Sequence, residues 1–568
     1  MTQILKSNVI CKRIAEFVAA TFLCFSNALF ASPQVPDSLI AELGCAGCHA
    51  NLPATHLTAQ IPDLSFAGLR YQPAYLFEYL QNPQKIRKHI GNSRMPDFHL
   101  QPDEALALTL FLSEQQFAPQ SAREIPATLQ KWENPAVEIP EIDQKIRSEY
   151  ACLSCHSFNG AGEQISVDLA TIGYRLKPEF VQQYLASPAV FGIAAAVMPP
   201  QFFAPENAFE PRYPDAATRV QNLTAFLMAT GKEQRSKMEQ VFAAAKEKFP
   251  AATAAIGEAI FRSQQCVGCH NHSQISAANR QLAPDLTGLG DRVQPEWLKE
   301  YLKKSHAIRP FGYQPGSGSR MPDFRLTDAE AETIAAYLLT VKSSRRLPEI
   351  PFEITPLSGF SMNKTTQLLN EKLPCIGCHT IGETGGKIGP NLNSVNLRLT
   401  PDYLWAIISD PQAVLPHNHM PKIPMPESWR ENIFKFLHQQ SNAATTTEAT
   451  YLSLVNHPVT LPGENKNTAE LYAQMCGICH GETGDGNGYN ARYLPVSPTA
   501  HSDSAYMSTR QDAALYDGIA AGGFVMNRSH AMPPFLETLT KAQIADLVKY
   551  MRKLCNCEAP SWSRDGSR

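Results

Sequence analysis

Apolar residues recur at helical spacing in five segments of the chain, and each segment has an aromatic residue near its middle or end. We predict a helix in each of them, over residues 103–114, 216–232, 328–342, 427–440 and 540–554. An apolar stripe of this kind is most simply the face of a helix that packs into a core. The aromatic residues are Phe111, Phe226, Tyr337, Phe436 and Tyr550.

A second helix is predicted ahead of the first four of these, from the repeated pattern Arg-x-x-Pro-x-aromatic-aliphatic. Proline suits the first turn of a helix, because the N–H that it lacks would have no partner there. The aromatic residue one turn later would then point into the core. The pattern begins at Arg70, Arg175, Arg292 and Arg398.

The chain has 568 residues, which is too long for one core and suits several domains. Its net charge of −3 provides no basic surface of the kind that binds nucleic acid. Proline is frequent, with 43 residues, and many prolines stand at matching positions of the repeats.

The pentapeptide Cys-x-x-Cys-His occurs five times, and the first cysteines of successive copies stand 101 to 114 residues apart. Two thiols at this spacing can form thioether bonds to one haem, and the histidine behind them then binds the iron. A structural zinc site would need four ligands, and no second pair recurs within a unit. We therefore predict five tandem units with one covalently bound haem each. The attachment cysteines are Cys45, Cys48, Cys152, Cys155, Cys266, Cys269, Cys375, Cys378, Cys476 and Cys479, and the iron-binding histidines are His49, His156, His270, His379 and His480.

The second axial ligand separates electron carriers, which fill this position, from catalysts, which leave it open. In every unit a methionine followed by proline stands 41 to 52 residues after the haem histidine. In the fourth unit His417, His419 and Met425 lie in the same loop and stay alternatives. We predict that the sixth ligands are Met95, Met198, Met321, Met420 and Met532.

The haem histidine also needs an acceptor for its other ring N–H, usually a backbone carbonyl. The loops after the motifs offer candidates at matching places, namely Pro62, Pro284 and Pro390, with Val167 in the second unit and Pro495 or Pro498 in the fifth. The arginine of Arg-x-x-Pro either pairs with a haem propionate or is a solvated surface residue.

The first residues resemble an export signal. Lys6, Lys12 and Arg13 precede a mostly apolar stretch over 17–30, and small residues follow it. We predict a cleaved signal peptide over residues 1–31; an uncleaved anchor is the alternative, but the stretch is shorter than the ~20 residues that span a bilayer. No later segment is apolar enough to span a membrane. Haem attachment in bacteria takes place outside the cytoplasm, so we expect a periplasmic or otherwise exported protein.

Two cysteines outside the motifs, Cys555 and Cys557, stand near the end of the chain. Residues two apart rarely reach disulfide geometry. We therefore expect them to be free or bonded to another molecule.

Taken together, the Cys-x-x-Cys-His motifs, the turn from Gly389 to Leu392, the Met-Pro loops and the aromatic-bearing last helices resemble class I cytochrome c domains. The fifth unit, with its glycine-rich stretch from Gly481 to Gly488, resembles the small bacterial periplasmic cytochromes of this class. The resemblance implies an all-α fold around each of five haem c groups, His/Met ligation and electron transfer. We call the five domains units 1 to 5, with boundaries at 32–125, 138–233, 250–345, 360–442 and 463–557.

We expect this multihaem c-type cytochrome to be an electron carrier between redox proteins outside the cytoplasm, and not an enzyme. A peroxidase-like haem enzyme is one alternative, and it would need one unit with an open iron position, for which the fourth unit is the only candidate. A cytochrome subunit of a periplasmic dehydrogenase or reductase complex is the other, because it would use the same haem chemistry.

Overall fold

The computed structural model is mostly helical. Among the described residues, no helix combines the length and the apolar character needed to cross a membrane. The predicted leader, His49 and His417 lie outside the described residues. The structure describes residues 39–41, 43–48, 61–86, 94–117, 125–135, 139–191, 198–204, 210–270, 272, 274–275, 283–284, 286–309, 311–312, 318–415, 418–440, 451–456 and 467–563.

Units 1 to 4 share one order of helices after the cysteine motif: a single turn, a middle helix that starts at proline, and a long closing helix. In unit 1 these are α3 (Ala67–Arg70), α4 (Pro73–Gln81) and α5 (Pro102–Glu114). In unit 2 they are α8 (Ile172–Arg175), α9 (Pro178–Ala186) and α10 (Ala216–Ala229). In unit 3 they are α13 (Leu289–Arg292), α14 (Pro295–Lys303) and α15 (Asp328–Thr340). In unit 4 they are α18 (Val395–Arg398), α19 (Pro401–Ser409) and α21 (Glu427–Gln439).

Other helices precede the motifs or complete the units. Those before a motif are α7 (Ile139–Ser148), α12 (Ala254–Ser263), α16 (Gly359–Glu371) and α22 (Thr468–Tyr472). Unit 5 continues with α24 (Ser504–Met507), α25 (Asp512–Val525) and α26 (Lys541–Cys555). The short helices α6 (Ala127–Gln130) and α20 (Pro411–Val414) and the connecting helix α11 (Lys232–Lys248) lie between these elements.

Two small antiparallel hairpins follow the motifs of units 2 and 4. In the first, Ser157 pairs with Gly162, and in the second, Thr380 pairs with Gly385. Their strands are β1 (Ser157–Phe158), β2 (Ala161–Gly162), β3 (Thr380–Ile381) and β4 (Thr384–Gly385).

The predicted closing helices are confirmed to within one or two residues in four units. The exception is the helix predicted over 216–232, which ends at Ala229. Thr230 is extended and Gly231 adopts a left-handed conformation with φ of 63°, so the chain turns before α11 begins. Glycine takes this conformation without steric cost, and it separates two helices that the apolar pattern joins.

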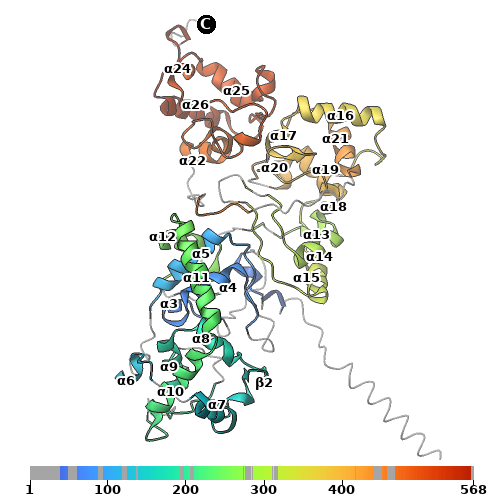
Figure 1. Ribbon diagram of the computed structural model, residues 1–568. Coiled ribbons are helices and arrows are strands. Elements are labelled where there is room, and N and C mark those ends of the chain that lie inside the picture. The colour runs from blue at the N-terminus through green and yellow to red at the C-terminus, as the bar shows by residue number, and fades with distance from the viewer. Residues whose placement is uncertain are drawn as a thin grey trace, which may run out of the picture.

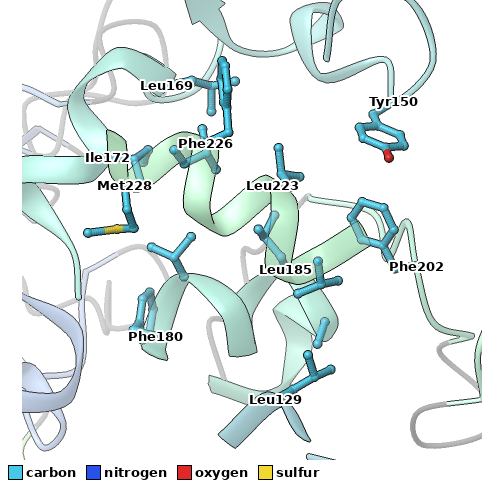
Figure 2. Packing of buried hydrophobic residues seen from close by; sticks show 14 of the residues in the cluster. Leu129, Tyr150, Leu169, Ile172, Phe180, Leu185, Phe202, Leu223, Phe226 and Met228 are labelled. Atoms are coloured by element: carbon cyan, nitrogen blue, oxygen red, sulfur yellow. The ribbon is translucent and has the colours of Figure 1, made fainter. Parts of the chain in front are cut away.

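The core of unit 2 forms mainly between α8, α9 and α10 (Figure 2), and Phe66 of unit 1 also packs in it. Phe180 and Leu185 of α9 lie opposite Leu223 and Phe226 of α10. Leu129 of α6 closes the same cluster from outside the unit. Units 4 and 5 likewise have separate buried clusters.

Units 1 and 3 are interlocked. Helix α12, which belongs to unit 3 by sequence, packs against α5 of unit 1 (Figure 1). The two helices approach so closely that a Cβ added at Gly257 would lie 2.0 Å from the carbonyl oxygen of Ala107. In return, Leu39, Ile40 and Leu43 pack in the cluster of α13, α14 and α15.

The two copies of Arg-Met-Pro-Asp-Phe meet at this junction. The backbone N–H of Asp97 donates to the carbonyl of Asp323 at 2.8 Å, and that of Asp323 donates to Asp97 at 2.7 Å. The arginine of each copy pairs with a glutamate in the first turn of the other unit's closing helix: Arg94 with Glu330 of α15, and Arg320 with Glu104 of α5.

A second type of junction joins unit 1 to unit 2 and unit 3 to unit 4, through the segments that enter the middle helices. In the first pair, the N–H of Gln72 donates to Arg175 and that of Lys177 donates to Arg70, both at 3.0 Å. The other pair repeats the arrangement: Gln294 donates to Arg398 at 2.9 Å, and Thr400 to Arg292 at 3.0 Å.

Units 4 and 5 meet at their cysteine motifs. The side chain of Asn490, which is fully buried, donates from Nδ2 to the carbonyl of Gly377 at 2.8 Å. Its Oδ1 accepts from the N–H of Lys387 at 3.1 Å. These contacts and the two preceding types place the units in the spatial order 2, 1, 3, 4, 5, which Figure 1 shows from the lower end of the molecule to the red domain.

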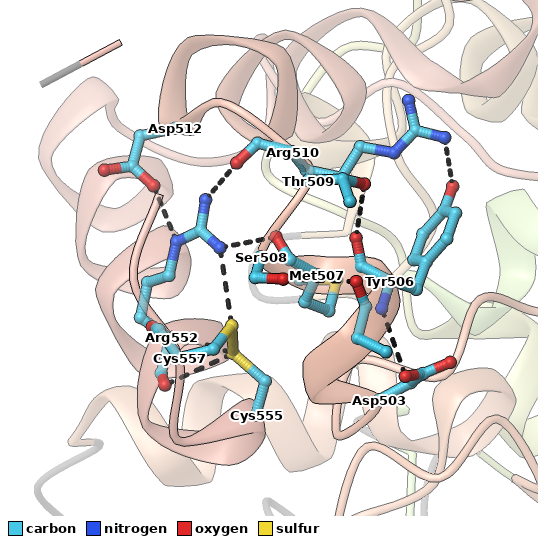
Figure 3. Close-up of a disulfide and its surroundings, with 11 residues drawn as sticks. Asp503, Tyr506, Met507, Ser508, Thr509, Arg510, Asp512, Arg552, Cys555 and Cys557 are labelled. Carbon is cyan, nitrogen blue, oxygen red and sulfur yellow. Dashed lines mark hydrogen bonds and ion pairs between the residues drawn. A yellow bond between two sulfur atoms is a disulfide. The ribbon is translucent and has the colours of Figure 1, made fainter. Parts of the chain in front are cut away.

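The expectation that Cys555 and Cys557 are not bonded to each other is wrong, because they form a disulfide (Figure 3). Helix α26 ends at Cys555, and Asn556 adopts a left-handed conformation that reverses the chain. The N–H of Cys557 then donates back to the carbonyl of Arg552 at 3.2 Å, and the Cα atoms of the two cysteines come within 5.2 Å. The helix end thus supplies the approach that an extended chain cannot.

Candidate haem-binding sites

Each described cysteine motif forms a tight turn. Single helical turns cover Cys45–Gly47, Cys152–Ser154, Cys266–Gly268 and Cys375–Cys378, and in unit 5 a π-helical turn over Ala473–Gly477 leads into α23 (Ile478–His480). In units 2, 3 and 4 the histidine N–H donates to the carbonyl of the first cysteine at 2.9–3.0 Å. These turns bring the two cysteines and the histidine of each motif close together, as attachment of one haem requires.

A backbone carbonyl accepts from Nδ1 of every described motif histidine. The acceptor is Val167 for His156 and Pro390 for His379, each at 2.8 Å. In unit 5 it is Thr499, whose carbonyl oxygen lies 2.8 Å from Nδ1 of His480, and not the predicted Pro495 or Pro498, although Pro498 directly precedes it. These bonds fix the ring and leave Nε2 to bind a metal.

The acceptor for His270 comes from another unit. Its Nδ1 lies 3.0 Å from the carbonyl oxygen of Pro62, and not from a residue of the loop that follows His270. Pro62 was predicted as an acceptor, but for the first motif. Burial lowers the pKa of His270, and the bond to Pro62 opposes this effect. The neutral imidazole that results is the form that binds iron.

The ten motif cysteines are not bonded to one another. Burial raises the pKa of Cys152 and Cys375 to about 11 and that of Cys476 to about 12. Desolvation thus favours the neutral thiol form of these three cysteines. Free thiols that stand three positions apart are the donor set that thioether attachment of haem requires.

The surroundings of the motif in unit 4 also fit a haem. A Cβ added at Gly389 would lie 2.6 Å from Nδ1 and Cε1 of His379, so only glycine allows the loop to approach the imidazole. This close approach brings the carbonyl of Pro390 to the ring.

Two of the four arginines of the Arg-x-x-Pro pattern have buried nitrogen atoms that no described residue satisfies. These are Nε and Nη1 of Arg70 and Nε of Arg175. In the other junction, burial lowers the pKa of Arg398 to about 10, and the nearby Arg292 lowers it further. Buried, unpaired guanidinium groups are costly unless an anion binds them, and haem propionates are anions of the right kind. Of the two interpretations, the structure therefore favours the propionate partner over the solvated residue.

Each of four predicted sixth ligands packs against the same buried cluster as a motif cysteine. Met198 shares its cluster with Cys152, and Met532 shares its cluster with Cys476. In the interlocked pair, Met95 shares its cluster with Cys266, and Met321 shares its cluster with Cys45.

Unit 4 contains two candidate methionines. Met420 stands seven residues before the first residue of its closing helix, as Met95 and Met321 do. Its backbone is held by Asn418, whose Oδ1 accepts from the Met420 N–H at 2.7 Å, and by Gln412. Met425 instead packs against the core cluster of the unit. The assignment of Met420 stays a prediction, and its position supports it.

Sequence reasoning missed His501. Its ring stacks on His480 with centroids 4.2 Å apart, and its Nδ1 lies 2.8 Å from the hydroxyl oxygen of Tyr472. Burial, together with His480, lowers the pKa of His501 well below its usual value. The neutral imidazole of His501 therefore packs against the ring of His480 and helps to hold it in place. No motif marks this residue; only its place two positions after the carbonyl of Thr499 could have suggested it.

Comparison with known families finds two matches. Residues 254–342 match the family described as cytochrome c, and residues 463–551 match the family described as cytochrome c oxidase, cbb3-type, subunit III. No curated protein and no solved structure matches the chain. The chain therefore contains two cytochrome c domains, which are haem-binding domains that carry electrons.

Proposed function

We propose that this chain is an exported c-type cytochrome with five haems that carries electrons between redox proteins. The proposal rests on a site that recurs along the chain. In each motif whose histidine is described, a backbone carbonyl accepts a hydrogen bond from Nδ1 of the histidine, and the two motif cysteines are free. The two matched cytochrome c domains lie within units 3 and 5. The other three carry the same motif.

Each haem would be held through the two cysteines and the histidine of one motif, with a methionine as the sixth ligand, and its iron would supply a reversible one-electron change. The residues of the chain orient the imidazoles, exclude water from the apolar clusters and offer arginines to the propionates. The five units in series extend the distance over which one molecule can connect a donor with an acceptor.

The experiment is a mass measurement on the mature, exported protein, together with its oxidised absorption spectrum. We expect five thioether-bound haems per chain and the far-red absorption band of Met–iron ligation. Fewer than five haems, or the lack of that band, would contradict the proposal.

A second candidate function is suggested by the match of residues 463–551 to an oxidase subunit family. The chain would then deliver electrons as part of a larger complex. Purification from the native membrane fraction under mild conditions separates the two: stable association with a catalytic subunit supports the complex, and recovery as a free protein supports the carrier.

A further inference from the structure

Among the described motif histidines, the acceptor distinguishes that of unit 3 from those of units 2, 4 and 5. In units 2 and 4 the acceptor follows the histidine by 11 residues, and in unit 5 by 19. For His270 it is Pro62, which is 208 residues away in the sequence. The imidazole of the third motif is therefore oriented by the loop of unit 1.

The helix before the third motif, α12, also packs on unit 1. Along its length α12 packs on α5, with the rings of Phe261 and Phe111 at 5.3 Å. Just past the motif, Nε2 of His272 lies 3.1 Å from Oε1 of Gln115, which directly follows α5. Cys266 and Met95 pack in this same cluster.

The first motif makes the reciprocal contacts. Leu39 and Ile40 are almost fully buried among α13, α14 and α15, with Ile334 and Leu338 of the closing helix in the same cluster. Cys45 and Met321 both pack against this cluster. Both halves of the exchange are thus present.

The two motif turns touch where the exchanged segments cross. A Cβ added at Gly47 would lie 3.0 Å from the Cα of Gly268. One added at Gly44 would lie 2.5 Å from Sγ of Cys269. Since the two turns are in contact, each attachment segment needs to span only a short distance to reach the neighbouring unit.

We propose that units 1 and 3 exchange their haem-attachment segments, so that each of these two haem sites is built from both units. A haem on Cys266 and Cys269 would then be held by His270 and Met95, and a haem on Cys45 and Cys48 would take Met321 as its methionine. The inference rests on the proposed function, because it concerns the ligands of two of the five haems.

The test removes one haem-attachment site and then measures which methionine substitution still changes the far-red band. In the variant C266A/C269A, which lacks the third attachment site, we expect four haems per chain. Adding Met95→His should then leave the far-red band unchanged, because Met95 no longer faces a bound haem. Adding Met321→His should remove about a quarter of the band, since one of four Met–iron bonds is replaced.

Met198→His in the same background is the matched control and should remove about a quarter of the band in either arrangement. The reverse result, with loss on Met95→His and none on Met321→His, overturns the exchange. The proposed function fails separately, if the unmodified protein lacks five haems or the far-red band.

A second measurement does not depend on removing a haem. In the full chain with Gln115→Glu and His272→Lys, a zero-length carbodiimide should join residues 115 and 272 within one monomer, because the side chains they replace are in contact. Peptide mapping that finds the cross-link supports the exchange. Its absence in a protein that retains five haems contradicts the exchange.

Discussion

At the scale of single residues, the sites depend on small groups that let the backbone reach the imidazole. Gly389 stands against the ring of His379, and its neighbour Pro390 accepts the Nδ1 hydrogen bond at 2.8 Å. The bond holds the ring in one tautomer and one orientation. A side chain at position 389 would push the loop and the ring apart.

We therefore expect Gly389→Ala to weaken the fourth haem site and to lower the free energy of unfolding by about 1–3 kcal/mol, the usual cost of overpacking. The far-red band should fall by about a fifth if the imidazole loses its orientation. Gly359→Ala is the control, because a Cβ there has nothing within 4 Å. Equal stability of both variants would show that the loop yields without cost. The measurements are denaturant unfolding and the oxidised spectrum.

The two methionines of unit 4 make a second prediction at this scale. We expect Met420→Ala to remove about a fifth of the far-red band, because Met420 has the same spacing to its closing helix as Met95 and Met321. Met425→Ala should keep the band and lower stability by about 1–2 kcal/mol, since Met425 is only partly buried in the core. Loss of the band in Met425→Ala alone would assign the ligand to Met425.

At the scale of elements, the turns before the middle helices position the arginines. In three units a glycine two residues before the arginine lies against a carbonyl at the end of the closing helix: a Cβ at Gly68, Gly173 or Gly290 would come within 2.0–2.1 Å of it. The close packing of α3, α8 and α13 on the closing helices thus sets where the guanidinium groups lie. Unit 4 uses Asn396 at the same place, and its Nδ2 donates to His438 at 3.1 Å.

If these arginines bind haem propionates, then Arg398→Met should lower the midpoint potential of one haem. A nearby positive charge favours the reduced iron, which carries one positive charge less, so its removal favours the oxidised state. Arg398→Lys keeps the charge and should shift the potential less. Arg346→Met, at a side chain that is 86% exposed, should leave all five potentials unchanged. Spectroscopic redox titration measures the effect, and unchanged potentials in Arg398→Met would assign Arg398 a structural role only.

The helices of this fold were largely predictable from the sequence, because apolar spacing and proline at the first turn are local signals. The cysteine turns and the carbonyl of Pro390 followed from the motif for the same reason. The interlocking of units 1 and 3 could not be predicted, because the two units offer equivalent helices and no local signal in the sequence says whether α12 packs on α5 or on α15. The Cys555–Cys557 disulfide was missed because it depends on the left-handed conformation of one residue, Asn556.

At the scale of the whole molecule, a segment from the link between units 4 and 5 binds back on the interlocked pair. Leu454 and Val455 are buried in the cluster of α5 and α12. The N–H of Leu454 donates to Oε1 of Glu104 at 2.6 Å, and Arg320 Nη2 donates to the carbonyl of Leu452 at 2.7 Å. The ion pair of Glu104 with Arg320 therefore links unit 1, unit 3 and this segment.

Because Glu104 belongs to unit 1 and Arg320 to unit 3, we expect the two units to unfold together. Glu104 is fully buried and lies 2.7 Å from Nη1 of Arg320, so Glu104→Gln leaves a buried guanidinium without its charge partner, at a cost of about 3–5 kcal/mol. We expect one thermal transition to move to lower temperature and to remove about two fifths of the far-red band, because both haem sites share the interface. Glu149→Gln is the control, since Glu149 pairs with Arg219 but is 45% exposed, and such pairs contribute little. Loss of only one fifth of the band in that transition would mean that units 1 and 3 unfold independently, despite the helices that cross between them.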